Sequence, residues 1–144
     1  MRSRVSGFIF GCALVPLLTL KALAFEVSAN IVASVESDIG STPSINCYIY
    51  AYGTETNKLE RYSFASVPGV YDRDKKQVSC APKLFYTFSE IGVGVPVGNW
   101  VAFKVVISVT STAGYRTIVP YAGSATTPQN KFEIKLPLDK GIKL

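Results

Sequence analysis

The chain has 144 residues and no histidine, which removes the imidazole base, the usual nucleophilic triads and the commonest metal ligand. Cysteine is scarce as well, with three residues in all. No window shows the spacing of three to four residues that is typical of an amphipathic helix, and no internal repeat is visible. The sequence therefore favours neither a helical protein nor an enzyme that depends on histidine.

Residues 1–24 have the pattern of a secretory signal peptide. Arg2 and Arg4 precede an apolar run over 5–20, and the segment ends on small residues at Ala22 and Ala24. We expect cleavage between Ala24 and Phe25. The alternative is a membrane anchor, but the run holds about 16 residues where a span needs roughly 20. A lipoprotein site at Cys12 is disfavoured, because too few apolar residues precede it.

Loss of the signal changes the charge of the chain. It removes three of the 15 basic residues and none of the 10 acidic ones, which lowers the net charge from +5 to about +2. Such a chain lacks the strongly basic face expected of a nucleic-acid-binding protein. The mature chain of about 120 residues is large enough for one domain with its own core.

Two cysteines, Cys47 and Cys80, remain in the mature chain. In an oxidising compartment an isolated pair forms a disulfide, so we expect thiolate catalysis and a cysteine zinc site to be excluded. Closing this loop stabilises a fold by about 4 kcal/mol in the chain-entropy description. Two buried free thiols are the alternative.

Alternation of apolar and polar residues dominates the mature sequence and predicts β-strands. The clearest strands cover 25–36, 45–52 and 100–110, with Val101, Phe103, Val105, Ile107 and Val109 facing inward in the last. Further strands are predicted at 59–67, 77–80, 83–88, 115–121 and 131–138, the last with Phe132, Ile134, Leu136 and Leu138 on one side. Polar or glycine-rich loops are expected at 38–44, 53–58, 68–76, 92–98, 111–114 and 122–130. Six to eight short strands indicate an all-β antiparallel sandwich, with a small β-barrel as the alternative.

Three tyrosines share one face of the strand at 45–52, namely Tyr48, Tyr50 and Tyr52. Their rings could stack on sugars or anchor a partner protein. The other interpretation is that this face packs under the second sheet or against a loop. Four lysines near the end of the chain could meet an anionic surface or simply keep an edge strand soluble: Lys131, Lys135, Lys140 and Lys143.

Carboxylates are the remaining acid/base candidates, and Asp72 with Asp74 is the closest pair. Both lie in the charged run 72–76, which indicates a solvated turn, whereas a glycosidase pair needs a cleft. The glycines at 92, 94 and 98 have no following helix or phosphate lysine, so no nucleotide loop is predicted. We expect no enzymatic activity, no cofactor and no metal site.

Two segments of the chain have a pattern known from other proteins. Residues 96–109 read PVGNWVAFKVVISV, a Gly-x-aromatic opening followed by an alternating valine strand, and 25–36 is a long alternating strand at the start of the expected mature chain. The two segments resemble those of bacterial fimbrial subunits of the chaperone-usher type, which donate such a first strand to a neighbour. The resemblance implies an immunoglobulin-like sandwich completed by strand addition. The assembly strand would carry Phe25, Val27, Ala29, Ile31, Ala33 and Val35. In such subunits the valine strand closes the chain, whereas here about 35 residues follow it.

These observations predict a secreted, cell-surface or periplasmic protein that binds or assembles. The first hypothesis is a fimbrial subunit or adhesin, which self-assembles or binds a protein or a glycan. The second is a monomeric secreted effector or inhibitor that binds a host or competitor protein. A small carboxylate hydrolase ranks last. No nucleic acid and no membrane span in the mature chain are expected.

Overall fold

The computed structural model describes residues 24–36, 39–40, 42–53, 62–92, 101–125 and 131–136. Apart from Ala24, the expected signal peptide lies outside these ranges, as do Gly94, Gly98, Trp100, Leu138, Lys140 and Lys143. The described part contains strands and turns and no helix. It therefore holds no helix that could cross a membrane. The strands are β1 (Phe25–Ala29), β2 (Ile31–Ser34), β3 (Ser44–Gly53), β4 (Tyr62–Pro68), β5 (Val70–Asp72), β6 (Gln77–Cys80), β7 (Lys83–Tyr86), β8 (Val101–Ser111), β9 (Gly114–Ala125) and β10 (Lys131–Ile134).

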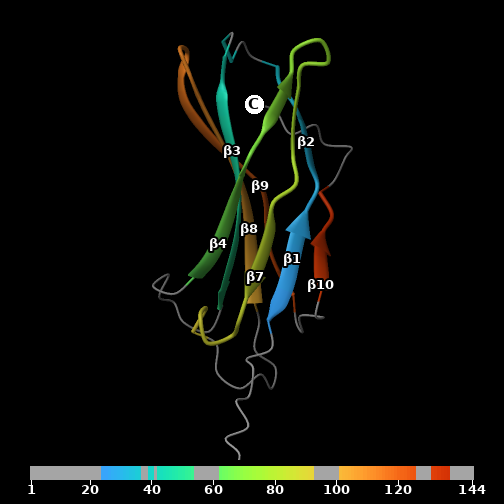
Figure 1. The fold of residues 1–144 in the computed structure, drawn as a ribbon, viewed down its shortest axis with the longest axis vertical. Helices are drawn as coiled ribbons and strands as arrows, with labels where there is room; N and C mark the ends of the chain where they lie inside the picture. Colours follow the sequence, from blue (N-terminus) through green and yellow to red (C-terminus); the bar gives the residue numbers. More distant parts are fainter. Residues whose placement is uncertain are drawn as a thin grey trace, which may run out of the picture.

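The strands form two layers that pack face to face, with the long strands running along the length of the molecule (Figure 1). The first layer has the order β4-β3-β8-β9 and is antiparallel throughout. The strand predicted at 45–52 pairs with the one predicted at 59–67, and the strand predicted at 100–110 pairs with the one predicted at 115–121. Within the described residues β4 and β9 do not pair with each other, so the sheet stays open and the fold is a sandwich.

The second layer consists of two three-stranded sheets, β10-β1-β7 and β2-β6-β5. Strands β1 and β2 follow each other along the chain, and they pair with β7 and β6, which also follow each other. The pairing offset between β1 and β7 continues unchanged between β2 and β6. The interruption falls where Ala29 and Asn30 lie opposite Pro82 and Ala81, because proline has no N–H to donate to the ladder. The backbone N–H of Ala29 still donates to the carbonyl of Pro82 at 3.1 Å. The strand predicted over 25–36 is thus one extended segment with a local break.

One pairing is parallel, although the expected sandwich was antiparallel. β10 lies beside β1 and runs in the same direction, with Val27 opposite Phe132 and Ala29 opposite Ile134. This pairing joins the first described strand to the last. Leu136 is half-buried against the core as predicted, and strand geometry ends at Ile134.

The prediction of a loop over 68–76 is wrong for its first half, which forms the end of β4 and the short strand β5. The chain passes from β4 in the first layer to β5 in the second with Gly69 as the single residue between them. The N–H of Gly69 donates to the carbonyl of Ile45 at 2.9 Å. A Cβ atom at position 69 would lie 2.5 Å from Cγ2 of Ile45, so only glycine fits this crossing.

β9 is longer than predicted, because it extends to Ala125 and so includes the first residues of the loop predicted over 122–130. The β8–β9 register shifts between Val105 and Ile107, where Val119 and Pro120 lie in β9. Because Pro120 has no N–H, a bulge at this point lets the strand continue past it.

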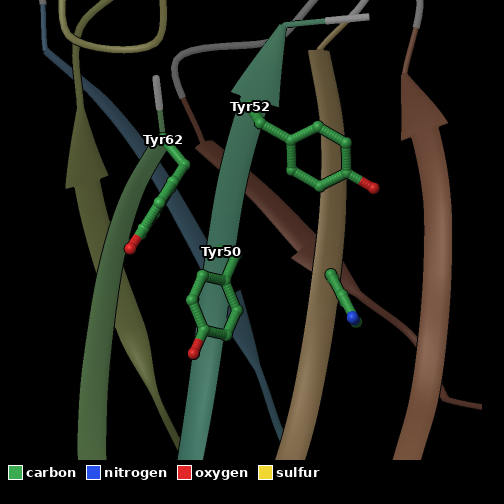
Figure 2. Close-up of a pocket in the computed structure, with 4 residues that line it drawn as sticks. Tyr50, Tyr52 and Tyr62 are labelled. Carbon is green, nitrogen blue, oxygen red and sulfur yellow. The ribbon is translucent and has the colours of Figure 1, made fainter. Parts of the chain in front are cut away.

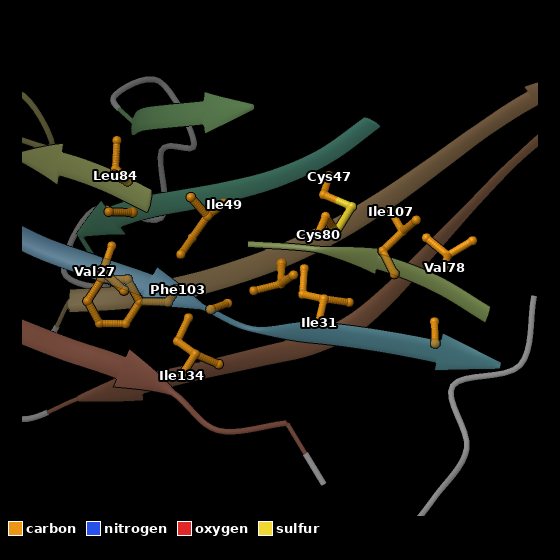
Figure 3. Close-up of a cluster of buried hydrophobic side chains, with 14 of the residues drawn as sticks. Val27, Ile31, Cys47, Ile49, Val78, Cys80, Leu84, Phe103, Ile107 and Ile134 are labelled. Carbon is orange, nitrogen blue, oxygen red and sulfur yellow. A yellow bond between two sulfur atoms is a disulfide. The ribbon is translucent and has the colours of Figure 1, made fainter. Parts of the chain in front are cut away.

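The core lies between the two layers. The inward residues of β1 and β2 are buried, and so are all five predicted inward residues of β8, which are at most 1% exposed. Figure 3 shows these side chains between the strands, with the Cys47–Cys80 disulfide among them. Phe103 lies at the centre and its ring contacts those of Tyr86 and Phe132, at centroid distances of 5.9 and 5.4 Å.

Tyr86 makes the stability of this core sensitive to alkaline pH. Its side chain is buried, and burial raises the pKa of Tyr86 to about 12, against about 10 in an unfolded chain. The fold therefore favours the neutral phenol. This contribution, about 2–3 kcal/mol, is fully present below pH 10 and is lost as the pH rises through 12. Urea titrations followed by circular dichroism should show the loss in the native chain and a smaller one in Tyr86→Phe. Equal losses in both chains would contradict the assignment.

Candidate functional site

The residues predicted as an assembly strand lie inside the chain's own sandwich. In the described part of the second layer, β1 lies between β10 and β7, and β2 pairs with β6 at the edge of its sheet. The six alternating side chains are all buried, with at most 8% exposure: Phe25, Val27, Ala29, Ile31, Ala33 and Val35. In this structure the segment completes its own domain.

The predicted disulfide is confirmed. Cys47 of β3 is bonded to Cys80 of β6, so the bond joins the two layers and closes a sequence separation of 33 residues. Such a bond is compatible with an oxidising compartment. Both cysteines are buried, at 0% and 9% exposure, which makes the pair a structural feature of the core.

The three tyrosines lie on the outer side of the first layer and not under the second one. Their neighbours on β3, Ile45, Cys47, Ile49 and Ala51, are the residues that face the core. Tyr48, Tyr50 and Tyr52 are half-buried by side chains of adjacent strands on the same face. Their rings form a row, and those of Tyr48 and Tyr50 stack at 6.1 Å.

The pairing of β3 with β4 extends this row sideways. Tyr62 is opposite Tyr52 and Phe64 is opposite Tyr50, and each of these two β4 side chains is 53% exposed. The ring of Tyr50 lies 5.9 Å from that of Tyr62 and 5.8 Å from that of Phe64. We define the aromatic face as Tyr48, Tyr50, Tyr52, Tyr62 and Phe64. The β4 half of this face was not predicted, although alternation within the strand predicted at 59–67 could have revealed it.

A hollow of about 240 Å³ opens on this face. It is lined by Tyr50, Tyr52, Tyr62 and Lys104. Tyr50 and Tyr52 project from β3 and Tyr62 from β4 on the same side of the sheet (Figure 2). Lys104 of β8 is the cross-strand partner of Tyr50, which places its side chain on the same outer face. Three strands thus contribute to the hollow.

The hydroxyl groups of the outer face occupy different environments. Burial among its neighbours raises the pKa of Tyr50, and the nearby phenols of Tyr48 and Tyr62 add to the effect. Farther along the face, the hydroxyls of Ser108 and Tyr115 are 3.1 Å apart, and hydrogen bonding to Ser108 and Thr117 lowers the pKa of Tyr115. At neutral pH Tyr50 therefore presents an uncharged hydroxyl.

The outer face of the second layer has a different character. Glu26 of β1 forms an ion pair with Lys83 of β7 at 3.1 Å, and the exposed residues Lys131 and Glu133 of β10 lie beside it. Phe85 is exposed there, at 59%, next to Glu26. Lys135 is also exposed, just after β10. Charges of both signs are therefore interspersed on this side, as on an ordinary solvated surface.

The carboxylates considered as acid/base candidates lie on an exposed turn. Asp72 accepts a hydrogen bond from the backbone N–H of Lys75 at 3.0 Å and pairs with its ammonium at 3.1 Å. These bonds lower the pKa of Asp72. Asp74 is exposed in the same turn. The arrangement closes a turn between β5 and β6, and the hollow contains neither carboxylate. Within the described ranges, no group of three or more potential metal-ligating side chains occurs.

The chain matches no known protein family, and comparisons with curated proteins and with solved structures likewise gave no match. The site is therefore interpreted from its own geometry.

Proposed function

We propose that this chain is a secreted binding module that holds its partner on the aromatic face of the first layer. The exposure of Tyr62 and Phe64, each 53%, carries the proposal. Clustered exposed aromatic side chains are unusual on a solvated surface and are enriched at the centres of binding interfaces. The second layer, with its mixed charges, has no comparable cluster among the described residues.

The face is well suited to binding because it is already ordered. Four of the five rings, those of Tyr48, Tyr50, Tyr62 and Phe64, pack against another ring of the set, and all five residues stand on hydrogen-bonded strands. A partner that docks here immobilises few side chains, and this lowers the entropic cost of association. We propose binding without catalysis, because the chain has no histidine and its closest carboxylate pair closes a turn.

Site-specific photocrosslinking tests this proposal. A benzoyl-phenylalanine placed at position 64 should crosslink to a partner in the medium or on the surface of the source cells. The matched control is the same residue at position 85, since Phe64 and Phe85 are similarly exposed but lie on opposite layers. A crosslink at 64 that Tyr50→Leu weakens supports the aromatic face. Equal crosslinking at both positions, or crosslinking only at 85, would place the binding surface elsewhere.

A fibre subunit that assembles by strand exchange is the second candidate, and the position of β1 and β2 favours it. This segment supplies alternating core residues beside β7 and β6, so the same segment of a neighbouring copy could occupy that place. Size-exclusion chromatography of the mature chain and of a variant lacking 25–36 separates the two candidates. We expect a monomer that unfolds on truncation. Polymers, or a truncated chain restored by a peptide of residues 25–36, would favour the fibre subunit.

A further inference from the structure

The hollow on the aromatic face combines aromatic rings, phenol hydroxyls and one cation. Three tyrosines line it together with Lys104. Aromatic rings offer flat apolar surface, and the hydroxyl groups can both donate and accept hydrogen bonds. A ligand that matches this site needs a ring-shaped body with apolar C–H surface, several hydroxyl groups and a negative charge.

The charge is the most specific part of the site. The strands of the first layer, β3, β4, β8 and β9, contain no aspartate or glutamate. Within the described ranges Lys104 has no ion pair, whereas Lys75 and Lys83 each pair with a carboxylate. An ammonium among aromatic rings, with no carboxylate on its sheet, attracts an anionic group from outside the chain.

The size of the hollow selects among anionic ligands. At about 240 Å³ it is smaller than the roughly 300–1,000 Å³ of sites that enclose a whole drug-sized molecule. It has room for one ring of a longer ligand. An acidic peptide side chain would pair with Lys104 but has no ring to lie against the tyrosines. Single-stranded nucleic acid needs a basic groove along its backbone, whereas Lys104 is the one lysine among the described residues that line the hollow.

We infer that the hollow binds the carboxylated ring of a uronic acid within an anionic polysaccharide. Lys104 pairs with the carboxylate, Tyr50 and Tyr62 contact the ring, and the hydroxyl of Tyr52 bonds to sugar hydroxyls. This inference rests on the proposed function and specifies the ligand of the same face.

Titration of the ¹⁵N-labelled mature chain with tetragalacturonate tests the inference by NMR. Amide shifts should change in β3, β4 and β8 around the hollow. The fully methyl-esterified tetrasaccharide keeps the rings and loses the charges, so it should bind at least about tenfold more weakly, as expected for loss of a charge-assisted hydrogen bond.

Matched variants assign the effect to the hollow. Lys104→Gln should weaken tetragalacturonate binding at least about tenfold, whereas Lys131→Gln removes the same charge from the other layer and should change it less than about twofold. Tyr50→Leu should weaken binding similarly, and Tyr115→Leu, on the same face but outside the hollow, should not. Tyr52→Phe keeps the ring and tests the hydroxyl alone if Tyr50→Leu does not fold.

Other outcomes overturn the inference in distinguishable ways. Equal binding of the acid and the ester would show a neutral ligand on the same face, so the proposed function would stand. Shifts at the hollow caused by a hexaglutamate peptide, with none caused by tetragalacturonate, would assign the face to an acidic protein. No shifts with either probe would refute the anionic ligand. Shifts confined to the second layer would refute the proposed function as well.

Discussion

Replacing Cys47 and Cys80 together with alanine is expected to lower the free energy of unfolding by about 4 kcal/mol. The disulfide closes a sequence separation of 33 residues, so its loss returns conformational freedom mainly to the unfolded chain. It also removes the covalent link between β3 and β6, which lie in opposite layers. Since a domain is typically stable by only 5–15 kcal/mol, we expect the variant to be folded but close to its limit.

Equilibrium urea unfolding, followed by far-ultraviolet circular dichroism, measures this effect. The oxidised native chain, the same chain with dithiothreitol and the double variant should be compared. The reduced chain and the variant should unfold at similar urea concentrations, both well below the oxidised chain. A difference of less than about 1 kcal/mol between the oxidised chain and the variant would mean that the layers are held together almost entirely by packing.

Replacing Phe103 with alanine is expected to cost about 3–5 kcal/mol. Phe103 is fully buried, and its ring bridges the layers by contacting Tyr86 of β7 and Phe132 of β10. The substitution removes the free energy gained by burying a large apolar side chain. It also leaves a cavity that rigid strands cannot close.

Phe85→Ala is the matched control for this prediction, because it removes the same side chain at a position that is 59% exposed. It should change the free energy of unfolding by no more than about 0.5 kcal/mol. If the two variants are equally stable in urea, the centre of the core has been misassigned.

Much of the fold follows from local patterns in the sequence. Alternation alone identified the inward side chains of β8 and the buried face of 25–36, because a half-buried strand must repeat every two residues. The two cysteines outside the predicted signal segment were enough to predict the disulfide. Alternation also placed Tyr48, Tyr50 and Tyr52 on one face of β3, but it left open whether that face is exposed or covered, because a strand pattern does not show what packs on each side.

The features that were missed depend on contacts distant in sequence. β5 has three residues and lies between Gly69 and a charged turn, so its pairing with β6 leaves no periodic signal. The parallel pairing of β1 with β10 joins opposite ends of the chain. The hollow forms only when two pairings have the right register. The β3–β8 register places Lys104 beside Tyr50, and the β3–β4 register brings Tyr62 next to them. A single strand pattern cannot supply such a register.

The crossing at Gly69 has a consequence for how the domain opens. One continuous segment, 62–72, is hydrogen-bonded to β3 in the first layer and to β6 in the second, and the Cys47–Cys80 bond joins these same two strands. We therefore expect that neither sheet unfolds while the other stays folded. Amide hydrogens on both sides of the crossing, including that of Gly69, should therefore exchange with deuterium at a common slow rate, which is the behaviour of a single cooperative unit.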